Sequence, residues 1–413
     1  MTVSEKTKLF LMRWWAPLLL LAFLPVYYLI AVNNERSVDY LNNGFFTFWL
    51  SGRLPWLGLS PYSAADWVNS HHTFGATWIP ETIFPYPLPL ALITAPLGLL
   101  PLEKAYILWD TTAQVLIACC ILWLAMHWEG LNRQAYVVFL LLATVLNGNV
   151  YLGLMTGTFV TLFLFFLTLA LYFFETRRPW LAGVALAGLA LKPPLLLILG
   201  LIGLWLFFRR NWKAVGGVAL GGLGWLTLGL IQDPGWVRKF LGIGESLLNK
   251  RLGYQPTILS YTRLACAGRL DCAFLLYGVI VAALIGVFAW LVWRRRETLS
   301  PLMLFSAAIA LGVLLPPYLW SYDYTLLLIP ICYIVFDLIR RRGTYLHSTL
   351  FLLLLDALSI TGLVFFWMNP ASDTLSIQRD MWSIWVALLV LGLSWWMVFR
   401  APQADFLAQK PAV

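Results

Sequence analysis

The feature that most constrains this chain is a series of long apolar runs that contain no charged side chain. Residues 14–32, 214–232 and 272–293 hold no Asp, Glu, Lys or Arg. A helix needs about 20 apolar residues to cross the hydrocarbon core of a bilayer. Only 11% of the residues are charged, whereas soluble domains average about 25%. The pattern therefore excludes an ordinary soluble enzyme, a disordered chain and a disulfide-stapled secreted domain.

The apolar runs predict an all-α, polytopic integral membrane protein. The short alternating strands of a membrane barrel are missing, so the spans should be helices. We expect about twelve transmembrane helices in a single domain over residues 1–413. They are expected near 14–32, 104–126, 134–146, 155–175, 180–191, 195–208, 214–232, 272–293, 299–316, 321–338, 345–367 and 382–399.

Basic clusters between the runs set the expected orientation. They are Arg177-Arg178, Arg209-Arg210 with Lys213, 294–296 and 340–342. Short basic loops stay in the cytoplasm, so both termini should be cytoplasmic, with 400–413 as a short tail. The run 14–32 is expected to be an uncleaved anchor, because its end is a poor signal-peptide cleavage site. The formal charge of +9 is then mostly an orientation signal, and no nucleic-acid partner is expected.

This orientation leaves three longer segments outside, at 33–86, 233–271 and 368–380. It also makes 180–208 a hairpin whose tip, Lys192-Pro193-Pro194, lies at or near the outer face. Residues 86–101 are short and rich in proline, which favours a re-entrant or interfacial element over a clean span.

The first outer segment, 33–86, is unusually long and aromatic for a loop. Residues 39–51 predict an aromatic helix that could lie in the membrane interface. The alternative is that the segment merely connects two spans. Loops of such length are usually functional or disordered, and this one carries too many aromatic residues for disorder.

Ionisable residues within a membrane protein are rare and are candidates for function. Asp39, Lys192 and Asp323 are the best placed of them. Asp39 and Asp323 could instead only cap helices, and Lys192 could extend to the lipid headgroups. Asp110 and Asp356 lie within spans, where a buried hydrogen-bonded group is a more common role than catalysis.

His71 and His72 could bind acceptor hydroxyls or a phosphate, or could be a solvated loop pair. Cys266 and Cys272 flank a short outer turn and could form a structural disulfide. The sequence has no zinc-type Cys/His spacing, no P-loop and no Asp-x-Asp pair. We therefore expect no cofactor and no divalent metal.

Several short motifs of the sequence resemble those of glycosyltransferase family 87, the polyprenol-phosphate-mannose-dependent α-mannosyltransferases of the GT-C type. A long outer loop that follows the first helix and begins with an acidic residue is the GT-C arrangement. The resemblance extends over roughly residues 14–340. The motifs that carry it are Asp39-Tyr40, Ser60-Pro61-Tyr62, Phe84-Pro85-Tyr86-Pro87, Gly148-Asn149, Gly183 with Gly188 and Lys192-Pro193, and Pro317-Tyr318 with Tyr322-Asp323. The order and spacing of these motifs are more specific to the family than any single motif.

The resemblance implies transfer of a hexose, mannose in that family, from a polyprenyl-phosphate donor to a glycolipid or glycan acceptor. The site would lie on the outer face of the plasma membrane, among membrane lipids. A phosphate leaving group needs no general acid, so one carboxylate base suffices for inverting single displacement. Asp39 would be that base, and Lys192, Arg263 and Arg269 would supply cations for the phosphate. The remaining candidates for substrate binding are Tyr40, Tyr62, His71, His72, Tyr86, Asn149, Tyr322 and Asp323.

Two other classes of protein remain as alternatives. Broken helices and buried acids also occur in a transporter or flippase of lipid-linked sugars, and a non-catalytic scaffold is the third reading. A transporter should place its polar site near the centre of the bilayer. Here the polar residues gather in the outer segments, which favours the enzyme.

Overall fold

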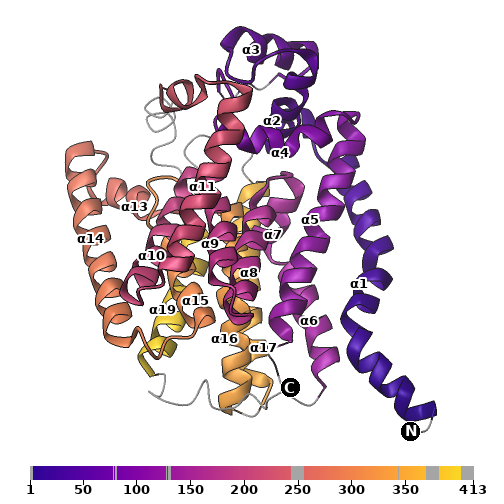
Figure 1. Ribbon diagram of the computed structural model, residues 1–413, viewed down its shortest axis with the longest axis vertical. Coiled ribbons are helices and arrows are strands. Elements are labelled where there is room, and N and C mark those ends of the chain that lie inside the picture. The colour runs from indigo at the N-terminus through magenta and orange to yellow at the C-terminus, as the bar shows by residue number, and fades with distance from the viewer. Residues whose placement is uncertain are drawn as a thin grey trace.

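The computed structural model describes residues 3–77, 79, 81–126, 128, 132–242, 255–342, 344–368 and 381–400. All regular secondary structure in these ranges is helical, as the apolar runs predict (Figure 1). All but the first residue of the tail 400–413, residues 243–254 of the second outer segment and nearly all of 368–380 lie outside the described residues.

The helices begin and end within a few residues of the expected bounds over most of the chain. In the first half they are α1 (Val3–Ser37), η1 (Tyr40–Asn42), α2 (Gly44–Arg53), η2 (Leu54–Leu57), α3 (Ala64–Thr73), α4 (Leu88–Gly98), α5 (Leu102–Ala125), α6 (Arg133–Val145), α7 (Gly148–Met155) and α8 (Val160–Glu175). In the second half they are α9 (Pro179–Leu186), η3 (Ala187–Leu191), η4 (Pro193–Leu195), α10 (Leu196–Phe208), α11 (Trp212–Gln232), α13 (Ile258–Ala265), α14 (Leu270–Arg295), α15 (Pro301–Gly312), η5 (Ser321–Leu327), α16 (Leu328–Arg342), α17 (Leu346–Met368) and α19 (Ile384–Arg400).

Fewer helices than expected are long enough to cross a bilayer alone. Among the described residues 5 helices qualify, and 6 if the bent pair α6–α7 forms one span. The expected count of about twelve is therefore not confirmed. Seven further apolar helices, with α17 counted only to Gly362, have 10–17 residues. At about 1.5 Å per residue, such lengths are shorter than the ~30 Å hydrocarbon core.

The break at the start of α7 was not expected from the sequence. The expected spans 134–146 and 155–175 leave residues 147–154 between them, but most of these residues form α7, which follows α6 after a bend of 62°. The Asn147 side chain accepts the Asn149 N–H, and the Gly148 N–H donates to Ser359 Oγ at 3.1 Å. These bonds satisfy backbone groups that the bend would otherwise leave unpaired.

The first outer segment forms a packed cap layer, defined here as the described part of residues 40–98, at one end of the molecule (Figure 1). Helix α2 is buried on every side from Phe45 to Gly52. It crosses α4 so closely that a Cβ on Gly98 would lie 2.5 Å from the Arg53 nitrogen. The segment is thus more than a connecting loop. The expected interfacial placement of 39–51 stays a prediction; within the protein, α2 is buried from Phe45 to Gly52.

The basic ends of the helices lie away from the cap layer. Figure 1 shows the start of α1 and the ends of α14 and α16 at the opposite end of the bundle. The end of α14 carries Arg294–Arg295, and the end of α16 carries Arg340–Arg342. The cytoplasmic location of these ends stays a prediction.

Candidate functional site

The polar centre of the described chain is an ion pair between Lys192 and Asp323. Lys192 Nζ donates to Asp323 Oδ1, and the two residues are 5% and 0% exposed. The other carboxylate oxygen, Oδ2, accepts the Trp320 N–H at 3.2 Å. Asp323 therefore does cap the start of η5, as one alternative held, and it also pairs with Lys192. Lys192 does not extend to the lipid headgroups.

A small pocket surrounds this pair. It is lined by Pro85, Tyr86, Lys192, Pro194, Tyr318, Leu319, Trp320 and Asp323. Its open space is about 10 Å³, which is room for at most one water molecule. A phosphate can enter only if the lining side chains move apart.

The hairpin 180–208 places Lys192 at this pocket because the short 3-10 turns η3 and η4 interrupt the chain between α9 and α10. Lys192 has an extended backbone (φ −131°, ψ 101°) between η3 and η4, where Pro193 and Pro194 follow. Proline cannot continue the preceding helix, so the chain turns at this residue. The hairpin was predicted with Lys192 at its tip, and the structure has it there.

Glycines hold the first arm of the hairpin directly against α11. A Cβ on Gly183 would lie 2.0 Å from the Ala214 carbonyl oxygen, and one on Gly217 would lie 2.0 Å from the Trp180 carbonyl oxygen. Small residues of this kind allow helix backbones to approach closely in membrane proteins. The position of Lys192 thus depends on the contact between α9 and α11.

Tyr322 forms one wall beside the ion pair. Lys192 Nζ lies 5.1 Å from the centre of the Tyr322 ring, and the Trp320 ring stacks on the same tyrosine with 6.3 Å between centroids. Helix α7 packs against Tyr322 at Gly153. A Cβ added to Gly153 would lie 3.7 Å from the Tyr322 Cβ, which is van der Waals contact. A cation over an aromatic face is stabilised by the ring quadrupole.

Asp39 lies apart from the pocket. It stands at the N-cap position of η1, but its side chain caps no backbone N–H. Its Oδ2 instead accepts the Asn42 amide at 2.7 Å. The Asn42 oxygen accepts the Thr77 N–H at 2.8 Å, so Asn42 is itself held in place. The capping alternative is wrong for this side chain, which is exposed.

Helix α2 connects the surroundings of Asp39 to the Lys192 pocket. At its first turn Phe45 packs against Tyr106 with 5.2 Å between ring centroids, and Tyr40 packs 6.1 Å from the same ring. One turn later Phe48 contacts Tyr86, a pocket residue, at 5.1 Å. Both regions therefore rest on one buried helix.

The two outer tyrosines are held by hydrogen bonds. Tyr62 is buried, its hydroxyl donates to the Tyr86 carbonyl, and burial raises its pKa. Tyr40 donates to Glu103 at 3.4 Å, and its pKa is raised by burial and then by the nearby carboxylate. Tyr62 thus positions the segment that carries Tyr86, whereas Tyr40 lies beside Asp39.

The histidines do not form a pair. His71 is 0% exposed, its Nδ1 lies 2.8 Å from the Trp67 carbonyl oxygen, and its ring packs on Phe46 and Trp67. Burial lowers its pKa from 6.5, against the opposing effect of the Trp67 carbonyl. The solvated reading is wrong for His71, which belongs to the core of the cap layer. His72 is exposed. Neither residue lines the Lys192 pocket.

The remaining candidates also lie outside the pocket lining. Asn149 is buried in the first turn of α7, one turn before Gly153, and its Nδ2 has no hydrogen-bond partner in the described part of the chain. Arg263 lies on α13, and Arg269 precedes α14. A disulfide joins Cys266 to Cys272 between these helices, as the sequence allowed.

The acids within the spans are hydrogen-bonded, as expected. Asn34 donates to Asp110 at 2.9 Å, and Asn147 donates to Asp356 at 3.5 Å. Both pairs join helices that are distant in sequence.

The sequence did not single out Leu319, Trp320 or Pro194 as site residues, although they line the pocket. Their position in the sequence could have identified them. Each lies within two residues of a motif that carried the family resemblance, in 317–323 or 192–194.

A comparison with known families provides independent information. A model of glycosyltransferase family 87 matches residues 84–317, more than half of the 413 residues. The match includes Tyr86, Asn149 and Lys192. No curated protein and no solved structure is matched by the chain.

Proposed function

Since this chain belongs to glycosyltransferase family 87 and is a membrane glycosyltransferase, we propose that its donor is a polyprenyl-phosphate hexose, with mannose as the sugar. The acceptor is a lipid-linked sugar or a glycan. Transfer takes place on the outer face of the plasma membrane, at the end of the molecule that carries the cap layer.

The observation that carries the proposal is the buried ammonium group of Lys192. A buried cation requires an anionic partner, and Asp323 fills that role in this closed pocket. The donor phosphate has the same charge and the same hydrogen-bonding capacity as a carboxylate. When the pocket opens, the phosphate competes with Asp323 for Lys192. Tyr86, Tyr322 and Trp320 then supply aromatic surfaces for the sugar or the first isoprene unit.

The chemistry needs one base and one cation. The acceptor hydroxyl gives its proton to Asp39 while its oxygen attacks the anomeric carbon. The bond from that carbon to the phosphate oxygen breaks, and the phosphate leaves with the electron pair, so the configuration inverts. The leaving phosphate is stable as an anion, and Lys192 stabilises the charge that develops on it. We propose that the step uses no divalent metal.

Asp39 suits the role of base because its carboxylate is exposed and is oriented by Asn42. It lies outside the closed pocket. The proposal therefore requires an opening that brings the acceptor between Asp39 and the donor, and α2 is the element through which the two regions would move together.

The test is transfer from labelled polyprenyl-phosphate mannose, compared with the glucose analogue, in membranes that contain the protein. We expect a labelled lipid or glycan product that depends on the protein, a preference for mannose, and no loss of activity when a chelator is added. Labelled donor that crosses the membrane without forming a product would indicate the transporter instead.

A paired substitution separates the role of Lys192 from its effect on stability. Removing Lys192 alone would leave Asp323 buried and unpaired, at a cost of about 3–5 kcal/mol. The double variant Lys192→Met/Asp323→Leu replaces the pair with apolar groups and should fold. We expect it to lose donor use by about tenfold or more. The matched control is Lys239→Met/Asp233→Asn, which removes an ion pair of 2.7 Å at the end of α11. Full donor use by the first variant would refute the assignment of Lys192.

A further inference from the structure

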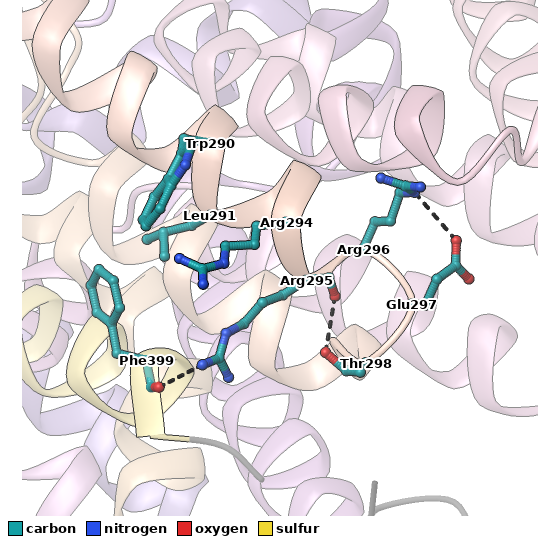
Figure 2. A pocket seen from close by; sticks show the side chains of 8 residues that line it. All are labelled: Trp290, Leu291, Arg294, Arg295, Arg296, Glu297, Thr298 and Phe399. Carbon is teal, nitrogen blue, oxygen red and sulfur yellow. Dashed lines mark hydrogen bonds and ion pairs between the residues drawn. The ribbon is translucent and has the colours of Figure 1, made fainter. Parts of the chain in front are cut away.

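A second polar cavity lies at the junction of α14 and α19, at the end of the bundle opposite the cap layer. Its volume is about 260 Å³, and it is lined by Trp290, Leu291, Arg294, Arg295, Arg296, Glu297, Thr298 and Phe399 (Figure 2). Nothing in the transfer reaction uses these residues.

The arginines that line the cavity have different tasks. Arg295 donates to the Phe399 carbonyl at 2.7 Å, and Arg296 pairs with Glu297 at 3.5 Å, as the dashed lines in Figure 2 show. The first bond satisfies a carbonyl at the C-terminal end of α19, where intrahelical partners run out. Arg294 points into the same space and lies 5.4 Å over the Trp290 ring. In the described part of the chain it has no carboxylate partner.

The cavity continues into an apolar surface. Along α14 the side chains of Leu275, Val279, Val287 and Trp290 are exposed on the outside of the bundle. In a bilayer this face contacts acyl chains, and tryptophan at such a helix end favours the depth of the headgroups. Three guanidinium groups against one carboxylate give the cavity an excess of positive charge.

We propose that this cavity binds the headgroup phosphate of an anionic glycerophospholipid. The phosphate oxygens accept hydrogen bonds from the Arg294 guanidinium, which can form a bidentate contact, while the acyl chains lie along α14. The site is a lipid site rather than a site for a soluble anion, because the apolar face of α14 begins at the cavity. Basic pockets between transmembrane helices bind acidic headgroups in this way.

The experiment measures lipid binding to the purified full chain in detergent, by native mass spectrometry and by thermal stability. The probes are dioleoyl phosphatidylglycerol, dioleoyl phosphatidylcholine and inorganic phosphate. We expect phosphatidylglycerol to bind and stabilise the protein, and the other two probes to do so at least tenfold more weakly.

Arg294→Gln should weaken phosphatidylglycerol binding by about tenfold, and Arg294→Lys should recover part of it. The matched control, Arg178→Gln, removes the same charge from an exposed position outside the cavity and should bind like the wild type. Equal binding of the two phospholipids would overturn the proposal, as would an Arg294→Gln variant that binds normally. Inorganic phosphate as effective as phosphatidylglycerol would also overturn it. The donor assay does not depend on any of these outcomes.

Discussion

At the scale of single residues, the chain separates two charged groups that the sequence had placed in one reaction. Lys192 is buried and paired, whereas Asp39 is exposed and accepts a hydrogen bond from Asn42. A buried ammonium group requires an anionic partner, which can be a carboxylate or a phosphate. An exposed carboxylate can accept a proton and release it to water. The two environments suit the two roles proposed for them.

Asp39→Asn keeps the shape and the hydrogen bond of the side chain but removes its basicity. We expect transferase activity to fall by about 100-fold or more at normal expression, measured as product formed from the labelled donor. Asn42→Ala should cause a smaller loss, of about tenfold, because the carboxylate loses its orienting amide. Near-normal activity of Asp39→Asn would refute its assignment as the base.

His71 gives the cap layer a dependence on pH. Its pKa is lowered by burial in the folded protein, so the unfolded chain takes up the proton first as the pH falls below about 6.5. Stability should therefore decline as the pH falls from 6.5 towards the lowered value, by at most about 1.4 kcal/mol per pH unit. Thermal unfolding at pH 7.5 and 5.5 measures this difference.

His71→Leu should reduce the difference between the two pH values, because the group that is protonated only on unfolding is gone. His72→Leu changes the exposed neighbour and should leave the difference as in the wild type. The same pH response in all three proteins would mean that other groups control it.

At the scale of elements, direct contacts between backbones fix the parts of the site. Gly183 and Gly217 allow α9 and α11 to touch, and Gly98 allows α4 to cross α2. These contacts lock the hairpin that carries Lys192 and the cap layer that carries Tyr86. Without them the pocket would have no fixed width.

Gly217→Val tests the first contact. The added side chain would overlap the Trp180 carbonyl, so we expect a loss of stability of at least about 1–3 kcal/mol and weaker donor use as Lys192 moves. The matched control is Gly216→Val, one residue earlier, where a Cβ meets open space. Equal unfolding temperatures for the two variants would contradict a close contact between α9 and α11.

At the scale of the whole molecule, the cap layer and the basic helix ends lie at opposite ends of one helical bundle. If the positive-inside rule holds for this chain, the basic helix ends are cytoplasmic and the cap layer lies outside, which is a prediction. Several apolar helices of the described chain are too short to cross the hydrocarbon core alone.

Cysteine labelling tests the orientation in intact cells. Thr73→Cys lies in the cap layer and Thr176→Cys follows α8, and both positions are exposed. An impermeant maleimide should label Thr73→Cys directly but Thr176→Cys only after permeabilisation. The wild type, with its own cysteines, gives the background. The reverse pattern would place the cap layer in the cytoplasm.

The sequence predicted most helix bounds, the turn at Lys192 and three residues that line the pocket, Tyr86, Lys192 and Asp323. It also singled out Tyr322, whose ring lies beside Lys192. The apolar runs and prolines act locally and predicted the helices and the turn, whereas the site residues followed from the family resemblance. It could not predict the break before α7, the burial of His71 or the distance of Asp39 from the pocket, because each depends on which helices pack together.

By itself, the sequence therefore determined that the chain is a helical membrane protein and which side chains could do chemistry, since a bilayer tolerates only satisfied backbones and few charges. Only the tertiary structure decided the partners of those side chains. Lys192 and Asp323 are 131 residues apart in the chain, and their pairing results from the packing of η3, η4 and η5. No local pattern encodes such a contact, because its energy arises only when distant helices meet and exclude water.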